Sequence, residues 1–138
     1  MEQTKSNGKK ILCIEDEHFI SELYARALRQ AGYDVTTMLS GDDGLRAAMS
    51  DEYDIILLDL MIPGITGFEV LRRLRKDAPN LKSKIIITTN LDQDDDDREE
   101  IENKADGYLI KAEFTPRQLV QIINDIAEGK KPSDNYLE

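Results

Sequence analysis

The sequence predicts an α/β fold: a five-stranded parallel sheet in the order 2-1-3-4-5 with helices on both faces, the flavodoxin-like doubly wound arrangement. Short apolar runs rich in isoleucine and leucine alternate along the chain with segments whose apolar residues recur at helical spacing. Strands that alternate with helices require right-handed crossovers, and these place helices on both faces of a parallel sheet.

The first half of the chain is expected to hold a disordered tail at residues 1–8 and then three strands, at 9–14, 33–38 and 54–59. Gly32 ends the first helix, whose buried face is expected to comprise Ile20, Leu23, Tyr24, Ala27, Leu28 and Ala31. Ser40 offers an N-cap for a second helix, which contains Leu45, Ala48 and Met49.

In the second half, a third helix follows Gly67 and ends near Pro79, and strands are expected at 84–89 and 107–110. The helix expected at 92–104 should be the least stable, because Ile101 is nearly its only apolar anchor and Asp94 to Asp97 is a run of four acids. The last helix starts with a Thr115 cap and Pro116, carries Leu119, Ile122, Ile123 and Ile126 on one face, and ends at Gly129, before a tail at 130–138.

Length and charge limit the classes of function. At 138 residues the chain has the size of one domain. Its net charge of -10 argues against nucleic acid or an anionic membrane as the main partner, because phosphates would be repelled. Cys13 is the only cysteine, which excludes a disulfide framework, and no apolar run has the length of a membrane span. We therefore expect a soluble, cytoplasmic protein.

Charged and hydroxyl side chains follow the predicted strands. Asp59 ends the apolar run at 55–58, Glu15 and Asp16 follow the run at 11–14, Lys111 follows the fifth strand, and Thr88 and Thr89 end the fourth. Each of these residues alone is more often structural; Asp59, for example, could simply cap the next helix. In the predicted strand order, however, Glu15, Asp16 and Asp59 converge at the switch point, where ligands bind in such sheets.

Converging carboxylates repel one another, and a metal ion would resolve that conflict. Hard oxygen ligands in small number suit Mg²⁺, which keeps several waters beside a phosphoryl group. Lys111 could neutralise the remaining negative charge, and a threonine hydroxyl could donate to an oxyanion on Asp59. These are the parts that phosphoryl transfer to an aspartate needs.

Four segments, 11–17, 57–64, 86–90 and 106–111, resemble in chain order the motifs of the receiver domain of two-component response regulators. The resemblance covers residues 9–129. It implies that Asp59 is the phosphoacceptor, that Glu15, Asp16, Asp59 and the backbone carbonyl of Met61 hold Mg²⁺, that Thr89 and Lys111 contact the phosphoryl group, and that Tyr108 is the aromatic switch residue.

Three positions depart from the family pattern. Glu15 replaces the commoner aspartate and is one methylene longer. Asn90 stands where alanine or glycine is usual, so it could contact the phosphoryl group and alter its lifetime. Ala112 replaces the proline that usually follows the lysine, and a cis bond before a non-proline residue costs roughly 2.5 to 4 kcal/mol.

The resemblance implies a signalling protein that catalyses only its own phosphoryl transfer and dephosphorylation. The phosphoryl group would come from a histidine kinase or a phosphotransfer protein. Because the chain ends soon after the last helix, a stand-alone receiver is expected. Phosphorylation would change its affinity for a partner, or its dimerisation, on the face formed by 92–104, 107–110 and the last helix. The alternatives are a degenerate receiver that acts only as an adaptor and a flavodoxin-like cofactor binder; an acidic loop after the first strand disfavours the second.

Overall fold

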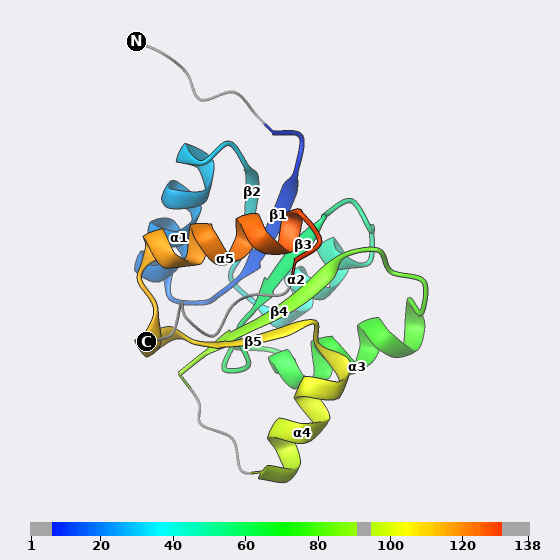
Figure 1. Cartoon of the computed structure of the whole chain (residues 1–138). Coiled ribbons are helices and arrows are strands. Elements are labelled where there is room, and N and C mark those ends of the chain that lie inside the picture. Colours follow the sequence, from blue (N-terminus) through cyan, green and yellow to red (C-terminus); the bar gives the residue numbers. More distant parts are fainter. Residues whose placement is uncertain (1–6, 91–94, 131–138) are drawn as a thin grey trace.

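A parallel sheet of five strands, in the order β2-β1-β3-β4-β5, forms the centre of the protein (Figure 1). The computed structural model describes residues 7–90 and 95–130. The strands are β1 (Lys10–Ile14), β2 (Asp34–Met38), β3 (Ile55–Leu58), β4 (Lys84–Thr89) and β5 (Gly107–Ile110). Both the strand order and the parallel pairing are those that the sequence predicts, so the predicted fold class is confirmed.

Within the described residues, five α-helices connect and follow the strands: α1 (His18–Gln30), α2 (Gly41–Ala48), α3 (Gly67–Asp77), α4 (Asp95–Lys104) and α5 (Pro116–Ala127). Helices α1 and α5 cover one face of the sheet, and α2, α3 and α4 cover the other (Figure 1). A short 3-10 helix, η1 (Lys111–Glu113), was not predicted. The predicted tails at 1–8 and 130–138, and the expected start of the fourth helix at Asp92, fall largely outside the described residues.

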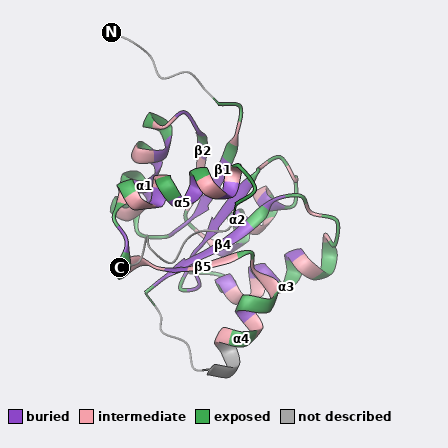
Figure 2. Cartoon of the chain, viewed as in Figure 1, coloured by how far each residue is buried: buried purple, intermediate pink, exposed green. Residues whose placement is uncertain are grey.

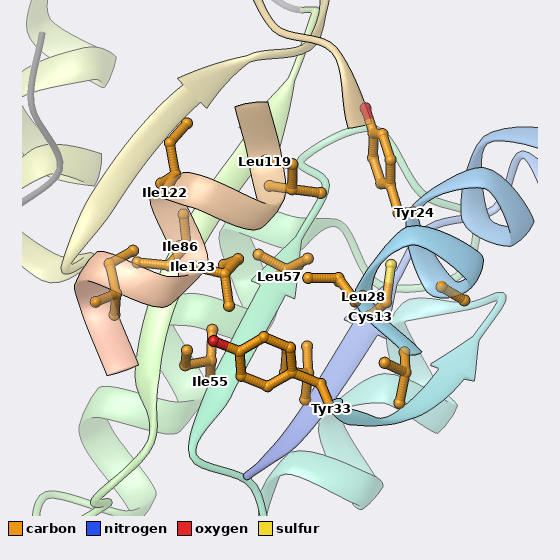
Figure 3. Packing of buried hydrophobic residues seen from close by; sticks show 14 of the residues in the cluster. Cys13, Tyr24, Leu28, Tyr33, Ile55, Leu57, Ile86, Leu119, Ile122 and Ile123 are labelled. Carbon is orange, nitrogen blue, oxygen red and sulfur yellow. The ribbon is translucent and has the colours of Figure 1, made fainter. Parts of the chain in front are cut away.

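The central strands are largely buried (Figure 2). Their side chains alternate between two separate cores, one on each face of the sheet. Ile11 and Cys13 point to the core under α1 and α5, which Figure 3 shows from close by, whereas Leu12 and Ile14 point to the core under α2, α3 and α4. This division follows from the two-residue period of a strand. It also explains why the strand sequences are continuous apolar runs: both faces are covered.

Several helix boundaries follow the predicted signals. The side chain of Ser40 accepts a hydrogen bond from the backbone N–H of Asp43, which caps α2. Thr115 and Gln118 form a capping box at the start of α5, with Pro116 as its first residue. Gly32 and Gly129, which follow α1 and α5, have φ angles of 104° and 81°, a region that favours glycine.

The predicted buried face of α1 is wrong in part. Leu23 is 39% exposed, whereas Ser21 and Ala25 are buried. The buried stripe is Ser21, Tyr24, Ala25 and Leu28, which has the spacing of a single helix face. The sequence pattern rotates this face about the helix axis because it counts apolar residues and passes over the buried Ser21. Met49, expected within α2, is its exposed C-cap.

Helix α4 is held differently from the other helices. Ile101 is the only buried side chain among those described for residues 98–104. Polar contacts to α3 supplement it: Arg72 pairs with Glu100 at 3.2 Å, and Arg75 Nε donates to the Lys104 carbonyl at 2.6 Å. An exposed ion pair contributes little stability, on the order of 0 to 1 kcal/mol. The described part of α4 is therefore attached by Ile101 and by these contacts to α3.

We predict that the backbone amides of residues 98–104 exchange with solvent faster than those of α5. Helix α5 buries four apolar residues, Leu119, Ile122, Ile123 and Ile126, whereas the described part of α4 buries one. Helices with few buried apolar contacts open at a lower free energy. Hydrogen exchange followed by mass spectrometry measures this difference, and equal protection of the two helices would contradict it.

Candidate functional site

The carboxyl ends of the central strands bring the candidate site residues together at one edge of the sheet. Glu15 follows β1, Asp59 follows β3, and Thr89 is the last residue of β4. The backbone N–H of Asp59 donates to the Ile14 carbonyl at 3.1 Å. The residues that follow β1 and β3 therefore lie side by side. Parallel pairing therefore fixes Glu15 and Asp59 as neighbours before any side chain interacts.

Three carboxylates form a cluster at this edge. Glu15, Asp16 and Asp59 each offer an oxygen, and these atoms lie within 4.8 Å of one another. Glu15 and Asp59 are 1% and 4% exposed, whereas Asp16 is exposed. Two buried carboxylates and one at the rim suit a hard divalent cation that keeps part of its water shell. The predicted convergence of these three acids is thus present in the structure.

Lys111 lies between the two buried acids. Its Nζ donates to Glu15 Oε1 and to Asp59 Oδ2, the latter at 2.8 Å, and its side chain is only 8% exposed. Burial opposes the charge of this ammonium group, but the hydrogen bonds to Asp59 and Glu15 outweigh burial and raise the pKa of Lys111. The lysine is therefore held as a cation between two anions.

Burial raises the pKa of Glu15 to about 7, and the charge of Asp59 adds to this effect while the hydrogen bond from Lys111 opposes it. One lysine does not fully offset the cost of placing this carboxylate in the interior. A further positive charge near Glu15 would therefore stabilise its carboxylate.

Backbone amides orient the remaining carboxylate oxygens. The N–H of Met61 donates to Asp59 Oδ1 at 3.0 Å, and the N–H of Glu17 donates to Glu15 Oε2 at 3.1 Å. Together with Lys111, these bonds fix both oxygens of Asp59. A carboxylate that lines a pocket and is held in one orientation is well placed to act as a nucleophile.

The side chains enclose a pocket of about 340 Å³, lined by Asp16, Glu17, Asp59, Met61, Thr89, Asn90 and Lys111. Of the two threonines that end β4, Thr89 lines this pocket and Thr88 is not among the lining residues. Asn90 also lies in the lining, next to Thr89. Glu17, the last residue of the acidic run that follows β1, also lines the pocket, although the sequence analysis gives it no role of its own.

Tyr108 is not in the pocket lining. Its half-buried ring packs against the core under α2, α3 and α4. The guanidinium of Arg98, in α4, lies over this ring with Cζ 4.8 Å from the ring centroid. Sequence analysis missed Arg98, because nothing in the pattern of α4 indicates which residue faces β5. The Lys111–Ala112 peptide bond, where a cis bond would be costly, is trans.

Comparison with known proteins identifies the family. The family model described as the response regulator receiver domain matches residues 11–124. The chain therefore belongs to the receiver domain family of two-component response regulators. Among the described residues, no helix is long and apolar enough to span a bilayer.

Curated relatives are transcriptional regulators. The chain is 34% identical over 128 residues to the phosphate regulon transcriptional regulatory protein PhoB of Pseudomonas aeruginosa, which covers 93% of this chain and 56% of that protein. It is 37% identical over 112 residues to the alkaline phosphatase synthesis transcriptional regulatory protein PhoP of Bacillus subtilis, covering 81% of this chain and 45% of that protein. The chain thus spans about half the length of these relatives.

Solved receiver structures share the fold. A CheY-like receiver domain protein from Methanospirillum hungatei superposes with a TM-score of 0.77 at 25% identity, covering 88% of this chain and 94% of that one. TrrA from Thermotoga maritima, solved in complex with Mg²⁺ and beryllofluoride, gives a TM-score of 0.72 at 32% identity, covering 86% and 98%. The second of these proteins holds a metal ion and a phosphoryl analogue.

We predict that Gly67→Ala destabilises the protein and impairs the site. A methyl group at Gly67 would overlap the Asp59 carbonyl oxygen and stand 2.6 Å from the Leu60 Cα, so the backbone that carries Asp59 must move. Overpacking of this kind costs about 1 to 3 kcal/mol of unfolding free energy. Denaturant unfolding measures the loss.

The matched control is Gly107→Ala. There the added methyl group would meet only the end of the Ile86 side chain, at 3.0 Å, which can shift. If both variants lose the same stability, close packing between Gly67 and the strand end does not hold Asp59 in place.

Proposed function

We propose that this chain accepts a phosphoryl group on Asp59 from a histidine kinase or a phosphotransfer protein. The observation that carries the proposal is the Asp59 carboxylate itself: it is buried, it faces the pocket, and its two oxygens are held by Lys111 and the Met61 amide. Membership of the receiver family supports the same assignment.

In the proposed step, an Asp59 carboxylate oxygen attacks the phosphorus of a phosphohistidine. The new P–O bond forms as the P–N bond breaks, and the imidazole leaves with the electron pair and takes a proton from solvent. Lys111 lies where it can balance the charge of the incoming phosphoryl oxygens. The hydroxyl of Thr89, in the pocket lining, can donate a hydrogen bond to one of them.

We further propose that the metal ion is Mg²⁺. Glu15, Asp16, Asp59 and the backbone carbonyl of Met61 would hold it, and bound Mg²⁺ supplies neutralising charge to the phosphoryl oxygens. The donor set fits, because it consists of hard oxygens with one carboxylate at the solvent rim. Glu15 is one methylene longer than aspartate, but it carries the same charge and its carboxylate lies in the cluster.

Phosphorylation is proposed to act through Thr89 and Tyr108. Movement of Thr89 toward the phosphoryl group would vacate space beside β4, into which Tyr108 could turn from β5. The surface altered would be that of α4, β5 and α5, where a partner protein or a second copy binds. Two expectations stay predictions: that this receiver works without an attached output domain, and that it is located in the cytoplasm.

A degenerate receiver that acts as a phosphorylation-independent adaptor is the alternative. The cluster of Glu15, Asp16 and Asp59, beside a pocket that Thr89 and Lys111 also line, disfavours it. The effect of Asn90 on the lifetime of the phosphoryl group also stays a prediction; its place in the pocket lining supports contact with that group or with the attacking water.

Asp59→Asn is predicted to abolish phosphorylation, because an amide oxygen is a far weaker nucleophile than a carboxylate while the side chain keeps its size. Incubation with acetyl phosphate and Mg²⁺, followed by intact mass measurement, should show one added phosphoryl group in the native protein and none in the variant. Asp34→Asn, at an exposed position that starts β2, is the control and should label normally. Equal labelling of all three proteins would place the acceptor elsewhere.

Mg²⁺ is predicted to stabilise the fold, since binding to the native state alone adds about 2.7 kcal/mol when free metal is a hundredfold above its dissociation constant. The melting temperature should rise with Mg²⁺ for the native protein. Asp16→Ala should reduce this rise, because it removes the carboxylate at the rim of the cluster.

Glu22→Ala, which removes an exposed carboxylate of α1 away from the cluster, should leave the response to Mg²⁺ unchanged. A melting temperature that does not depend on Mg²⁺, or an unaltered response in Asp16→Ala, would refute the assigned metal site.

A further inference from the structure

A cation lies over the half-exposed ring of Tyr108. The guanidinium of Arg98 lies over the tyrosine ring at 4.8 Å from Cζ to the centroid, within the range of a cation–π contact. Arg98 Nε also donates to Glu102 Oε1 at 2.9 Å, one turn further along α4. The carboxylate of Glu102 therefore orients the guanidinium that lies over the ring.

Tyr108 and Thr89 lie on the same face of the sheet. Tyr108 pairs with Ile87 in the register of β4 and β5, and Thr89 is two residues beyond Ile87 on the same strand. The tyrosine ring is half-buried and packs against the core on that face. A turn of the ring toward Thr89 would carry it inward and away from Arg98.

The backbone that carries Arg98 is anchored independently of Tyr108. Ile101, three residues further along α4, is fully buried, and Glu100 pairs with Arg72 of α3. Helix α4 is thus fixed at its C-terminal half while the guanidinium of Arg98 covers the ring. Because the backbone of α4 is held in place, we expect an inward turn of Tyr108 to break the contact with Arg98.

We propose that Arg98 is a positioning residue that holds Tyr108 in its outward orientation through this cation–π contact and so opposes the phosphorylated state. This inference rests on the proposed function, because it needs a phosphoryl group on Asp59 to favour the inward orientation. By linkage, whatever stabilises the outward ring weakens binding of a phosphoryl analogue by the same factor. The energy of a cation–π contact at an exposed site corresponds to about a two- to fivefold change in affinity.

The experiment compares the affinity of the full chain for beryllofluoride in the presence of Mg²⁺, by isothermal titration calorimetry. Arg98→Gln should bind about two to five times more tightly than the native protein. Arg98→Lys, which keeps a cation near the ring, should stay closer to the native value. If Arg98→Gln does not fold, Arg98→Met removes the same charge and keeps the aliphatic stem.

Arg73→Gln is the matched control. Arg73 forms the same kind of intrahelical pair as Arg98, from Nε to the carboxylate of Glu69 at 3.0 Å and four residues apart, and its side chain is 46% exposed compared with 41% for Arg98. The removal of Arg73 therefore reproduces the loss of charge and of the ion pair in a helix away from Tyr108. This variant should bind beryllofluoride with the native affinity.

A double-mutant cycle separates positioning of the ring from a general effect on α4. In a Tyr108→Leu background, Arg98→Gln should no longer change the affinity for beryllofluoride, because the ring that Arg98 contacts is gone. An equal gain in both backgrounds would overturn the inference.

Two further results would contradict the inference, and a third would contradict the proposed function as well. If Arg98→Gln and Arg73→Gln bind alike, or if Arg98→Gln binds more weakly than the native protein, the inference is wrong while the proposed function stands. If the native protein itself binds no beryllofluoride with Mg²⁺, both the inference and the proposed function are wrong.

Discussion

The contact of Lys111 with Glu15 and Asp59 is the interaction on which the site depends. Two carboxylates that are almost completely buried would repel each other and lose their hydration. A single ammonium group placed between them offsets part of that cost, and the raised pKa of Glu15 shows that part of it remains. The fold therefore holds a local excess of negative charge at the mouth of a pocket, a condition that favours binding of a cation.

The backbone places these charges with little help from the side chains. Strands β1 and β3 pair directly, so the residues that follow them, Glu15 and Asp59, must be neighbours. The carbonyl oxygen of Asp59 lies so close to Gly67 that a methyl group there would overlap it, and the Gly67 N–H donates to the Leu60 carbonyl at 3.1 Å. The loop after β3 thus packs tightly against the strand end that carries Asp59. The continuous apolar runs form the buried strands, and the pairing of these strands determines where the carboxylates lie.

The sequence predicts most of this arrangement, and its failures have identifiable physical causes. Buried parallel strands give the clearest pattern, so the sheet order and the convergence of Glu15, Asp16 and Asp59 could be predicted. The buried face of α1 was misplaced because Ser21 is polar yet buried beside the core. Arg98 could not be found, since an arginine in a charged helix has no periodic signal that tells which neighbour it faces. Contacts between elements distant in sequence become visible only when the helix is docked, and α4 has too few apolar residues to reveal its docking in the sequence.

The weak apolar anchoring of α4 has a consequence for how a charge at Asp59 can reach the surface. A helix that buried a full apolar stripe would resist displacement, as α5 does with its four buried residues. In α4, Ile101 holds the C-terminal half to the core, and polar contacts to α3 and to the ring of Tyr108 complete the attachment in the described part of the helix. Polar contacts of this kind exchange partners at small cost, since each contributes about 1 kcal/mol or less. The contact of Arg98 with Tyr108 is thus one of several weak polar contacts of α4, so the proposed turn of the ring can break it while the buried Ile101 keeps the helix attached to the core.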